Sequence, residues 1–422
     1  MIKKEMKNKE NLIFIRDLLG LFLVIWCINP EQRFYNWWIY GIILVFWGTF
    51  AFITEPAFYI KKLLLKPHII VLFVWPIVRG IYALFGRATF SIYLFTVPFI
   101  YILFWFYLNQ DEKIRNFYLE IILIYYILIN CISIIRLSIN PNISRLLANG
   151  DIQKTKHLAS PFTANYFHIY TLTFLVVLCI GVLKIEWKHK PQNMLRIYRE
   201  ILVFVVTGIV VIFKAQYTYA ILFVTFFSIF ILIFKPIKLS IKDVITVGIC
   251  LILGGIILFT LLYILAFLID NKYMIERFNE MFRLITTGNL SQGRDMYKRF
   301  ELYFSSINTF LKYPLFGIGG KEILEASQVG GHSEVLDCLA YYGMIGFMSF
   351  MSGMIVNFRK LLDILSESKR YIYIICFSVF IVQSIVNTCY GEQILSGLYI
   401  VAPLILLYKR EGINIEGAKD ET

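Results

Sequence analysis

Residues 166–185 have the sequence YFHIYTLTFLVVLCIGVLKI, in which Lys184 is the only residue with a permanent charge. An α-helix rises about 1.5 Å per residue, so about 20 apolar residues cross the hydrocarbon core of a bilayer, which is about 30 Å thick. Similar runs recur along the chain. Of its 422 residues, 59% are hydrophobic and only 16% are charged, whereas soluble domains have about 25% charged residues. The sequence therefore predicts an all-α, polytopic membrane protein.

The apolar runs predict about twelve transmembrane helices. We place them at residues 11–28, 37–60, 68–85, 88–108, 117–139, 166–185, 200–213, 217–234, 244–269, 334–356, 371–389 and 391–408. The first run lacks a small-residue cleavage pattern, so we expect a permanent helix rather than a cleaved signal. The expected organisation is a transmembrane bundle of nine helices over residues 1–269, an extracytoplasmic loop over 270–333, three more transmembrane helices over 334–408, and a cytoplasmic tail over 409–422.

Lysine and arginine are concentrated in alternate connections, which predicts the orientation because positive charge resists translocation. These basic clusters lie at residues 3–9, 61–66, 188–199, 235–242 and 359–370. Both chain ends are therefore expected in the cytoplasm, and the connections at 140–165, 214–216 and 270–333 outside it. The net charge of +13 is spread over loop ends that face anionic lipid headgroups, so we expect membrane lipids and no nucleic acid as partners.

The long outer loop has amphipathic segments of its own. Residues 271–287 and 296–312 have apolar residues at helical spacing, and the second segment is followed by Tyr313 and Pro314, which predict its end. We expect both segments to be helices resting against the bundle. A connection of this length far exceeds the usual loop of about 4–6 residues and is typical of a functional loop.

His332 is the strongest candidate for catalysis. An imidazole group accepts protons near neutral pH, and Glu334 or Asp337 would be placed to orient its ring. The alternative interpretation is a histidine that is only exposed or that caps the following helix. Arg294 is a permanent planar cation with five donors, which matches phosphate oxygens. Its neighbours Lys298 and Arg299 are expected on a solvated helix face.

Three further basic residues are candidates for substrate binding. Arg136 is expected at the outer end of a span and Arg145 in the loop that follows, and together they would hold a second part of a pyrophosphate; alternatively, Arg136 only extends to the interface. Lys214 is expected in a tight outer turn, either facing the same cavity or as a charge at a helix end. Asn165 and His168 begin a span on the same side, and we expect them to be structural.

Several other chemistries lack support. The chain contains no HExxH, GxSxG or P-loop pattern, so a metalloprotease, a serine hydrolase and an ATPase are not indicated. The seven cysteines lie in or beside apolar runs without CxxC spacing, which predicts neither a disulfide framework nor a cysteine metal site.

The outer loop resembles the O-antigen polymerase and O-antigen ligase superfamily of bacterial envelope glycosyltransferases. The resemblance rests on Gly293-Arg294, on Pro314 to Gly319, on His332-Ser333 and on Gly343 to Gly346, and it covers roughly residues 291–350. Two positions depart from the family pattern. Ser333 stands where asparagine is frequent, and Lys214-Ala215-Gln216 stands where a serine–arginine pair is often found.

The resemblance implies a metal-independent, inverting glycosyltransferase without a cofactor, in the bacterial cytoplasmic membrane with its active site facing outside. His332 would deprotonate an acceptor sugar, and Arg294 with Arg136 or Arg145 would neutralise the departing pyrophosphate. The implied substrate is an undecaprenyl-pyrophosphate-linked oligosaccharide repeat, polymerised into O-antigen (a lipopolysaccharide component), capsule or exopolysaccharide. A chain-length regulator and a flippase of the same pathway are the implied protein partners.

Two alternatives remain open at this level. An O-antigen ligase shares the chemistry and differs only in its acceptor, lipid A core, and no residue here decides between the two. A lipid-linked oligosaccharide flippase also has about twelve spans, but it normally has short loops and two similar halves, and we find no convincing internal repeat. The long loop with His332 therefore argues against a flippase. We favour a polymerase over a ligase because the otherwise short loops, the composition rich in Lys, Ile, Phe, Tyr and Asn, and the departures from the family pattern suit the divergent polymerases.

Overall fold

The computed structural model describes residues 2–30, 37–56, 60, 64–85, 96–108, 110, 112–148, 162–188, 196–233, 294–319, 328–389 and 391–408, with isolated positions between 260 and 279. Over these residues the chain forms helices and no strand. The first half contains α1 (Ile2–Ile28), α2 (Trp37–Thr54), α3 (Pro67–Ile70), η3 (Val71–Phe73), α4 (Val74–Leu84), α5 (Thr96–Leu108), α6 (Glu112–Ile139) and α7 (Ile143–Ala148). The second half contains α9 (Tyr166–Lys188), α10 (Arg196–Ala215), α11 (Thr218–Ile233), α14 (Arg294–Lys312), α15 (Glu334–Ile364), α16 (Glu367–Val386), α17 (Glu392–Ser396), the π-helical turn η6 (Gly397–Val401) and α18 (Ala402–Leu407).

Six of the described helices are long and apolar enough to cross a membrane, so the protein is a polytopic membrane protein. They are Lys9–Ile28, Pro67–Leu84, Glu112–Ile139, Tyr166–Trp187, Glu334–Ile364 and Glu367–Val386. The predicted count of about twelve is therefore wrong for the part of the chain that the structure describes.

The difference lies in the described length of several apolar helices. Four of the predicted spans are apolar helices of 10–17 described residues, and 17 residues extend only about 26 Å, which is less than the hydrocarbon core. A fifth, α10, carries Arg199 and Glu200 near its start and Lys214 near its end. The predicted span at 244–269 lies almost wholly outside the described residues.

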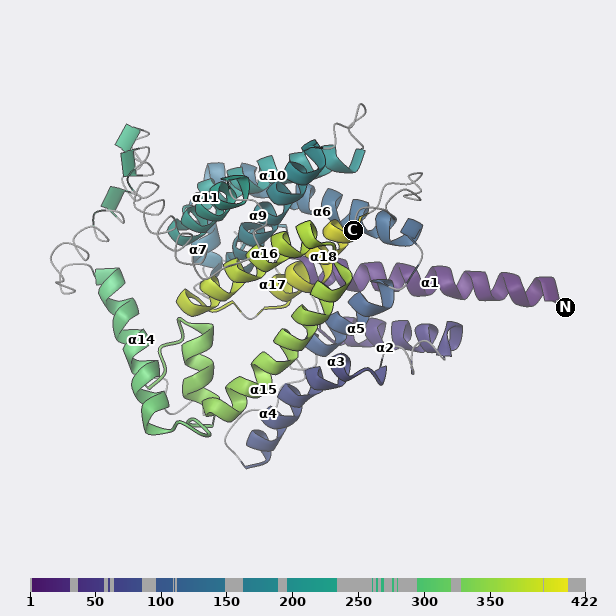
Figure 1. The fold of residues 1–422 in the computed structure, drawn as a ribbon, viewed down its shortest axis with the longest axis horizontal. Helices are drawn as coiled ribbons and strands as arrows, with labels where there is room; N and C mark the ends of the chain where they lie inside the picture. Colours follow the sequence, from purple (N-terminus) through teal and green to yellow (C-terminus); the bar gives the residue numbers. More distant parts are fainter. Residues whose placement is uncertain are drawn as a thin grey trace, which may run out of the picture.

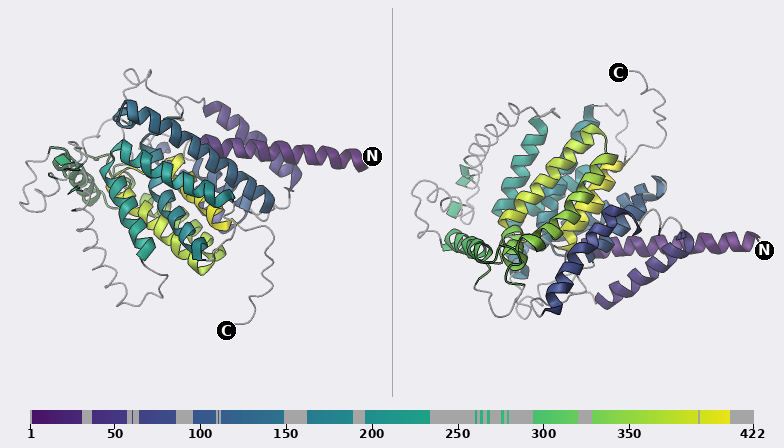
Figure 2. Two further views of the ribbon diagram at one scale, coloured as in Figure 1. Left: turned by 90° about the horizontal axis from the view of Figure 1, so that it is seen from above. Right: turned by 60° about the horizontal axis from the view of Figure 1, so that its bottom comes forward.

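Helix α9 is the centre of the bundle. Of its membrane-spanning residues, 78% are buried, a larger share than in the other five spans. It packs against α10, α11 and α16, while α6 packs on the outer side of α10 and α1 packs against α2. Figures 1 and 2 show this arrangement, with α9 enclosed by its neighbours and α1 extending from one end. The quoted run at 166–185 is apolar on all sides because α9 is surrounded by other helices.

Helix α15 is longer than predicted and is bent near its start. Gly343 has φ 62° and ψ −167°, which are not helical angles, and the chain changes direction there. The turns of α15 before Gly343 lie beside α14 across one end of the bundle, opposite the start of α1 (Figure 1). The turns after Gly343 enter the bundle. The two segments of the chain with the most polar sequence signals therefore meet at one end of the molecule.

Candidate functional site

The two glycine-containing motifs of the sequence are bonded to each other. The turn at 314–319 crosses the bend of α15, and Gly317, like Gly343, has a φ of +62°. Four backbone hydrogen bonds join the two segments: Ile318 N to Ala340 O at 3.1 Å, Gly319 N to Tyr341 O at 2.8 Å, Met344 N to Pro314 O at 2.8 Å and Ile345 N to Leu315 O at 3.2 Å. A Cβ atom on Gly343 would lie 2.4 Å from the carbonyl carbon of Leu315. Glycine is needed at these positions because the two backbones touch.

His332 lies in the turn that leads into α15, and its side chain is exposed. Its Nδ1 atom is 2.9 Å from the carbonyl oxygen of Gly331. Because a carbonyl oxygen only accepts hydrogen bonds, Nδ1 carries the hydrogen. In the neutral ring the lone pair is then on Nε2, which is the atom that can accept a proton.

Ser333 is the N-cap residue of α15. Asp337, in the first turns of the same helix, holds the turn that contains His332. The hydroxyl of Ser333 caps the helix by accepting from Leu336 N at 3.2 Å. The carboxylate of Asp337 accepts from Ser333 N at 3.0 Å and from the hydroxyl of Ser306, in α14, at 2.6 Å. Ser306 also accepts from Gly330 N at 2.9 Å. Asp337 therefore contacts the backbone of the turn, whereas the histidine ring is bonded to the carbonyl of Gly331.

The residue after α16 is bonded to the start of α15, in the region where α14 and α15 meet, which we call the α14–α15 junction. Glu334 N donates to the carbonyl oxygen of Asn387, which follows α16, at 3.1 Å. The side chain of Asn387 is buried, and its Nδ2 has no hydrogen-bond partner among the described residues. One helical turn earlier, Gln383 is fully buried, and both of its polar side-chain atoms lack a described partner. Buried amides without partners inside a membrane bundle are uncommon, because each costs about 1–3 kcal/mol.

Arg299 is the functional candidate that the sequence analysis did not identify. Its Nη1 donates to Oδ1 of Asn387 at 3.3 Å, and its guanidinium carbon lies 5.7 Å from the centre of the Tyr219 ring, a cation–π contact. Burial lowers the pKa of Arg299, but the oxygens of neighbouring tyrosines, that of Tyr219 first, have the opposite and larger combined effect, so its pKa is raised. Arg299 is therefore a charged group turned toward the bundle, and its expected position on a solvated face is wrong.

Arg299 faces the bundle because of the way α14 is rotated about its own axis. Arg299, Tyr303 and Ser306 share one face of the helix at helical spacing, and each makes a polar contact with the bundle. Tyr303 donates to the carbonyl oxygen of Val386 at 2.7 Å, and burial raises its pKa, so the hydroxyl keeps its proton at neutral pH. Of the four apolar residues whose spacing predicted this helix, Phe300 and Ile307 are partly buried, whereas Phe304 and Leu311 are 54% and 67% exposed. The helical spacing of the polar residues was the available signal.

A cluster of tyrosines lies beside Arg299, which interacts with Tyr219 and Tyr170. Tyr166 and Tyr170 begin α9 with ring centres 4.6 Å apart, and Tyr217, before α11, lies 5.9 Å from the first and 6.0 Å from the second. The start of α9, the turn between α10 and α11, and the α14–α15 junction therefore lie at the same end of the bundle. These are the three connections that the charge pattern assigned to one side of the membrane.

The remaining predicted site residues are placed as follows. Arg136 is in the last turn of α6 and Lys214 in the last turn of α10; both are partly buried, and neither has a described contact with His332. Arg294 begins α14 and Arg145 lies in α7, but their side chains are outside the described part of the structure. The assignment of all five predicted residues, His332 included, stays a prediction.

Asn165 and His168 are structural, as expected. Asn165 is buried and its Nδ2 donates to the carbonyl oxygen of Pro30, at the end of α1. His168 is fully buried, and its Nε2 is 3.1 Å from Oδ1 of Asn130 in α6. These bonds join α9 to α1 and α6, so neither side chain is available to a substrate.

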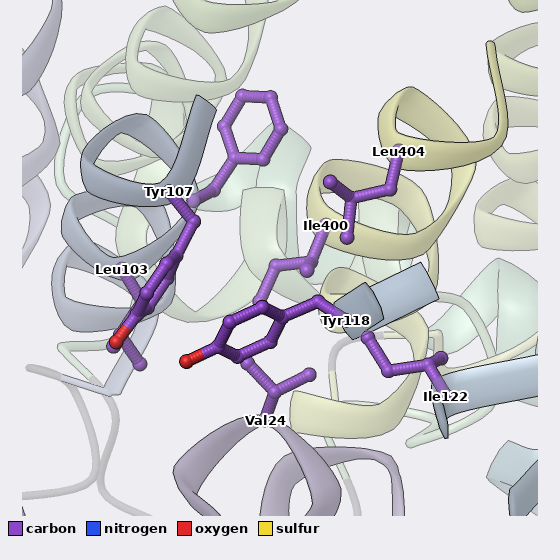
Figure 3. Close-up of a pocket in the computed structure, with 8 residues that line it drawn as sticks. Val24, Leu103, Tyr107, Tyr118, Ile122, Ile400 and Leu404 are labelled. Carbon is purple, nitrogen blue, oxygen red and sulfur yellow. The ribbon is translucent and has the colours of Figure 1, made fainter. Parts of the chain in front are cut away.

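The cavity shown in Figure 3 is not part of this junction. Its lining is apolar apart from two tyrosine hydroxyls, and it consists of Val24, Leu103, Phe104, Tyr107, Tyr118, Ile122, Ile400 and Leu404. The hydroxyls of Tyr107 and Tyr118 bond to backbone oxygens of Arg16 and Asp17 in α1, far along that helix from Pro30. The described residues contain no group of three His, Cys, Asp or Glu side chains that would hold a metal ion.

The comparisons with known proteins leave this geometry as the main guide to function. The chain matches no protein-family model, and no curated protein sequence is significantly similar to it.

Proposed function

We propose that this protein is a metal-independent, inverting glycosyltransferase that joins undecaprenyl-pyrophosphate-linked oligosaccharide repeats on the outer face of the bacterial cytoplasmic membrane. The observation that supports this best is the exposure and hydrogen bonding of His332. Its ring is exposed at one end of a membrane bundle, and the carbonyl of Gly331 holds the hydrogen on Nδ1, so that Nε2 can accept a proton.

The proposed reaction needs one proton acceptor and positive charge. Nε2 of His332 takes the proton from a hydroxyl of the acceptor sugar, and the resulting oxygen attacks the anomeric carbon of the donor. The bond from that carbon to the pyrophosphate breaks with inversion, and undecaprenyl pyrophosphate leaves. Arg299 supplies positive charge beside the α15 turn, and Arg294, Arg136, Arg145 and Lys214 are the further candidates for stabilising the departing charge.

The orientation belongs to the same proposal. The basic clusters predict cytoplasmic chain ends, which would place the tyrosine-lined end of the bundle outside the cytoplasm. An outward site suits a lipid-linked donor because its pyrophosphate lies at the headgroup level while its prenyl chain stays in the bilayer. The exposed Phe304 and Leu311 of α14 suit such an interface as well.

The test is the surface polysaccharide of a deletion strain that carries wild type, His332→Ala, Arg294→Ala or the control Lys298→Ala, whose side chain is exposed on α14. Loss of a general base lowers the rate by about 10²- to 10⁴-fold. We expect single-repeat glycans in the deletion strain and with the first two variants, and wild-type banding with the control.

Other outcomes are equally informative. Full-length polymer that is not attached to lipid A core would indicate a ligase. Lipid-linked repeats that stay on the inner side would indicate a flippase. Wild-type banding with well-expressed His332→Ala would show that the proposed mechanism is wrong.

A further inference from the structure

The carboxylate of Asp337 is buried directly beneath the His332 turn. Its exposed fraction is 7%, and that of Ser306 is 0%. One carboxylate oxygen accepts from Ser333 N and the other from the Ser306 hydroxyl. The Ser306 hydroxyl oxygen in turn accepts from Gly330 N. Asp337 therefore holds the backbone on both sides of His332, directly at Ser333 and through Ser306 at Gly330.

This arrangement is more than a helix cap. The hydroxyl of Ser333 accepts from Leu336 N in the first turn of α15, and the carboxylate of Asp337 accepts from Ser333 N in the manner of a capping box. The bond from Ser306 to Asp337 goes beyond the cap because it joins the turn to α14. Ser306 extends the connection because its oxygen also accepts from Gly330 N. The turn is thus fixed to two helices by buried, charge-assisted hydrogen bonds, which are the strong class.

The carbonyl group of Gly331 determines which ring nitrogen of His332 carries the hydrogen. Gly331 has a φ of +69°, and in this conformation its oxygen lies 2.9 Å from Nδ1 of His332. A rotation of that peptide would remove the acceptor and leave the ring free to place its hydrogen on either nitrogen. The hydrogen bond made by one ring nitrogen decides which nitrogen is protonated.

We propose that Asp337, anchored to Ser306 of α14, is a positioning residue that fixes His332 with its hydrogen on Nδ1 and its lone pair on Nε2. The role of that lone pair as a catalytic base rests on the function proposed above. The proposed tautomer of His332 does not depend on that function, so the tautomer and the catalytic role can be disproved separately.

The experiment is ¹⁵N NMR of the full chain, labelled at histidine and reconstituted in nanodiscs, at a pH where imidazole rings are neutral. The chain has five histidines, and the difference from His332→Gln assigns the signals of His332. Wild type is compared with Asp337→Asn and Ser306→Ala. The matched controls are Asp363→Asn, which removes an exposed carboxylate near the other end of α15, and Ser378→Ala, whose hydroxyl bonds only within α16.

We expect the Nδ1–H signal of His332 in wild type and both controls, and its loss in favour of Nε2–H in Asp337→Asn and Ser306→Ala. A thermal unfolding transition checks that each variant is folded, and Ser306→Ala decides the matter if Asp337→Asn does not fold. The proposal is overturned if wild-type His332 is protonated at Nε2, if the folded variants keep the Nδ1–H signal, or if the controls lose it too. Under the proposed function, both variants also lower kcat more than they raise KM.

Discussion

Arg299 in α14 donates a hydrogen bond from Nη1 to Oδ1 of Asn387, directly after α16, at 3.3 Å. This contact joins α14, a helix within the long predicted loop at 270–333, to the last part of the bundle. The backbone oxygen of the same asparagine accepts from Glu334 N in α15. Asn387 thus lies between Arg299 and the turn that carries His332, and this proximity is the main reason to treat them as one site.

Removing the guanidinium of Arg299 should reduce both stability and activity. In Arg299→Ala, the buried oxygen of Asn387 loses its donor, which costs about 1–3 kcal/mol in the free energy of unfolding. Arg299→Lys keeps the charge but loses the planar group over Tyr219. We expect Arg299→Ala to lower the unfolding temperature and to give mostly single-repeat glycans, with Arg299→Lys intermediate. Unchanged banding with Arg299→Ala, matching the exposed-neighbour control Lys298→Ala, would remove Arg299 from the site.

Gly343→Ala should disrupt the junction. An added Cβ would lie 2.4 Å from backbone atoms of Leu315, at a residue whose φ is +62°, and a strained non-glycine backbone alone costs about 1–3 kcal/mol. We expect a lower unfolding temperature and loss of polymer. Gly41→Ala is the control because nothing lies within 4 Å of its added Cβ. Equal unfolding temperatures for the two variants would contradict the crossing of the two backbones.

Tyr82→Phe tests the contact that holds α4 against this crossing. The hydroxyl of Tyr82 lies 3.0 Å from the carbonyl oxygen of Phe316 and 3.0 Å from that of Tyr342. Its removal takes away the single O–H donor that two carbonyl oxygens beside the bend share, at a cost of about 1–3 kcal/mol. We expect a clear fall in unfolding temperature, measured in detergent. Tyr313→Phe, at a side chain that is 50% exposed, should show almost none.

Arg16→Met tests a structural ion network near the middle of α1. The Arg16 side chain is 1% exposed and lies 2.8 Å from Oδ1 of Asp17 and 2.7 Å from Oε1 of Glu55. Removing one partner from a fully buried ion pair costs about 3–5 kcal/mol. The remaining carboxylates of Asp17 and Glu55 are 16% and 33% exposed, so we place the cost here at the lower end of that range. We expect poor assembly or a large fall in unfolding temperature, with little effect from Lys9→Met at an exposed position. A folded Arg16→Met protein of normal stability would show that the network is dispensable.

Several elements of the fold follow from local sequence alone. Residues 166–185 form α9 because a long apolar run in lipid satisfies its backbone groups only as a helix. Helix α14 ends at Lys312, where Tyr313 and Pro314 predicted its end. Both depend on residues close together in the chain. The structural roles of Asn165 and His168 were also predicted, but the partners that fix them, Pro30 and Asn130, lie far away in the sequence.

The number of spanning helices was overestimated for a physical reason. The run at 391–408 is apolar, but hydropathy does not show where a helix begins or ends. Its helical segment changes to π-helical turns at Gly397 and ends at Leu407. Helix length is decided by what the chain packs against, and the sequence pattern contains little of that information.

By itself, the sequence determined that this chain is a helical membrane protein and that His332 follows a glycine-rich turn, because hydrophobicity and turn chemistry are local properties. The tertiary structure decided which face of α14 meets the bundle and which groups surround His332. Arg299, Ser306, Asp337 and Asn387 are brought together by hydrogen bonds across three helical segments. In a bundle where apolar side chains can also face lipid, these polar contacts fix the rotation of the helix, and only folding brings their partners together.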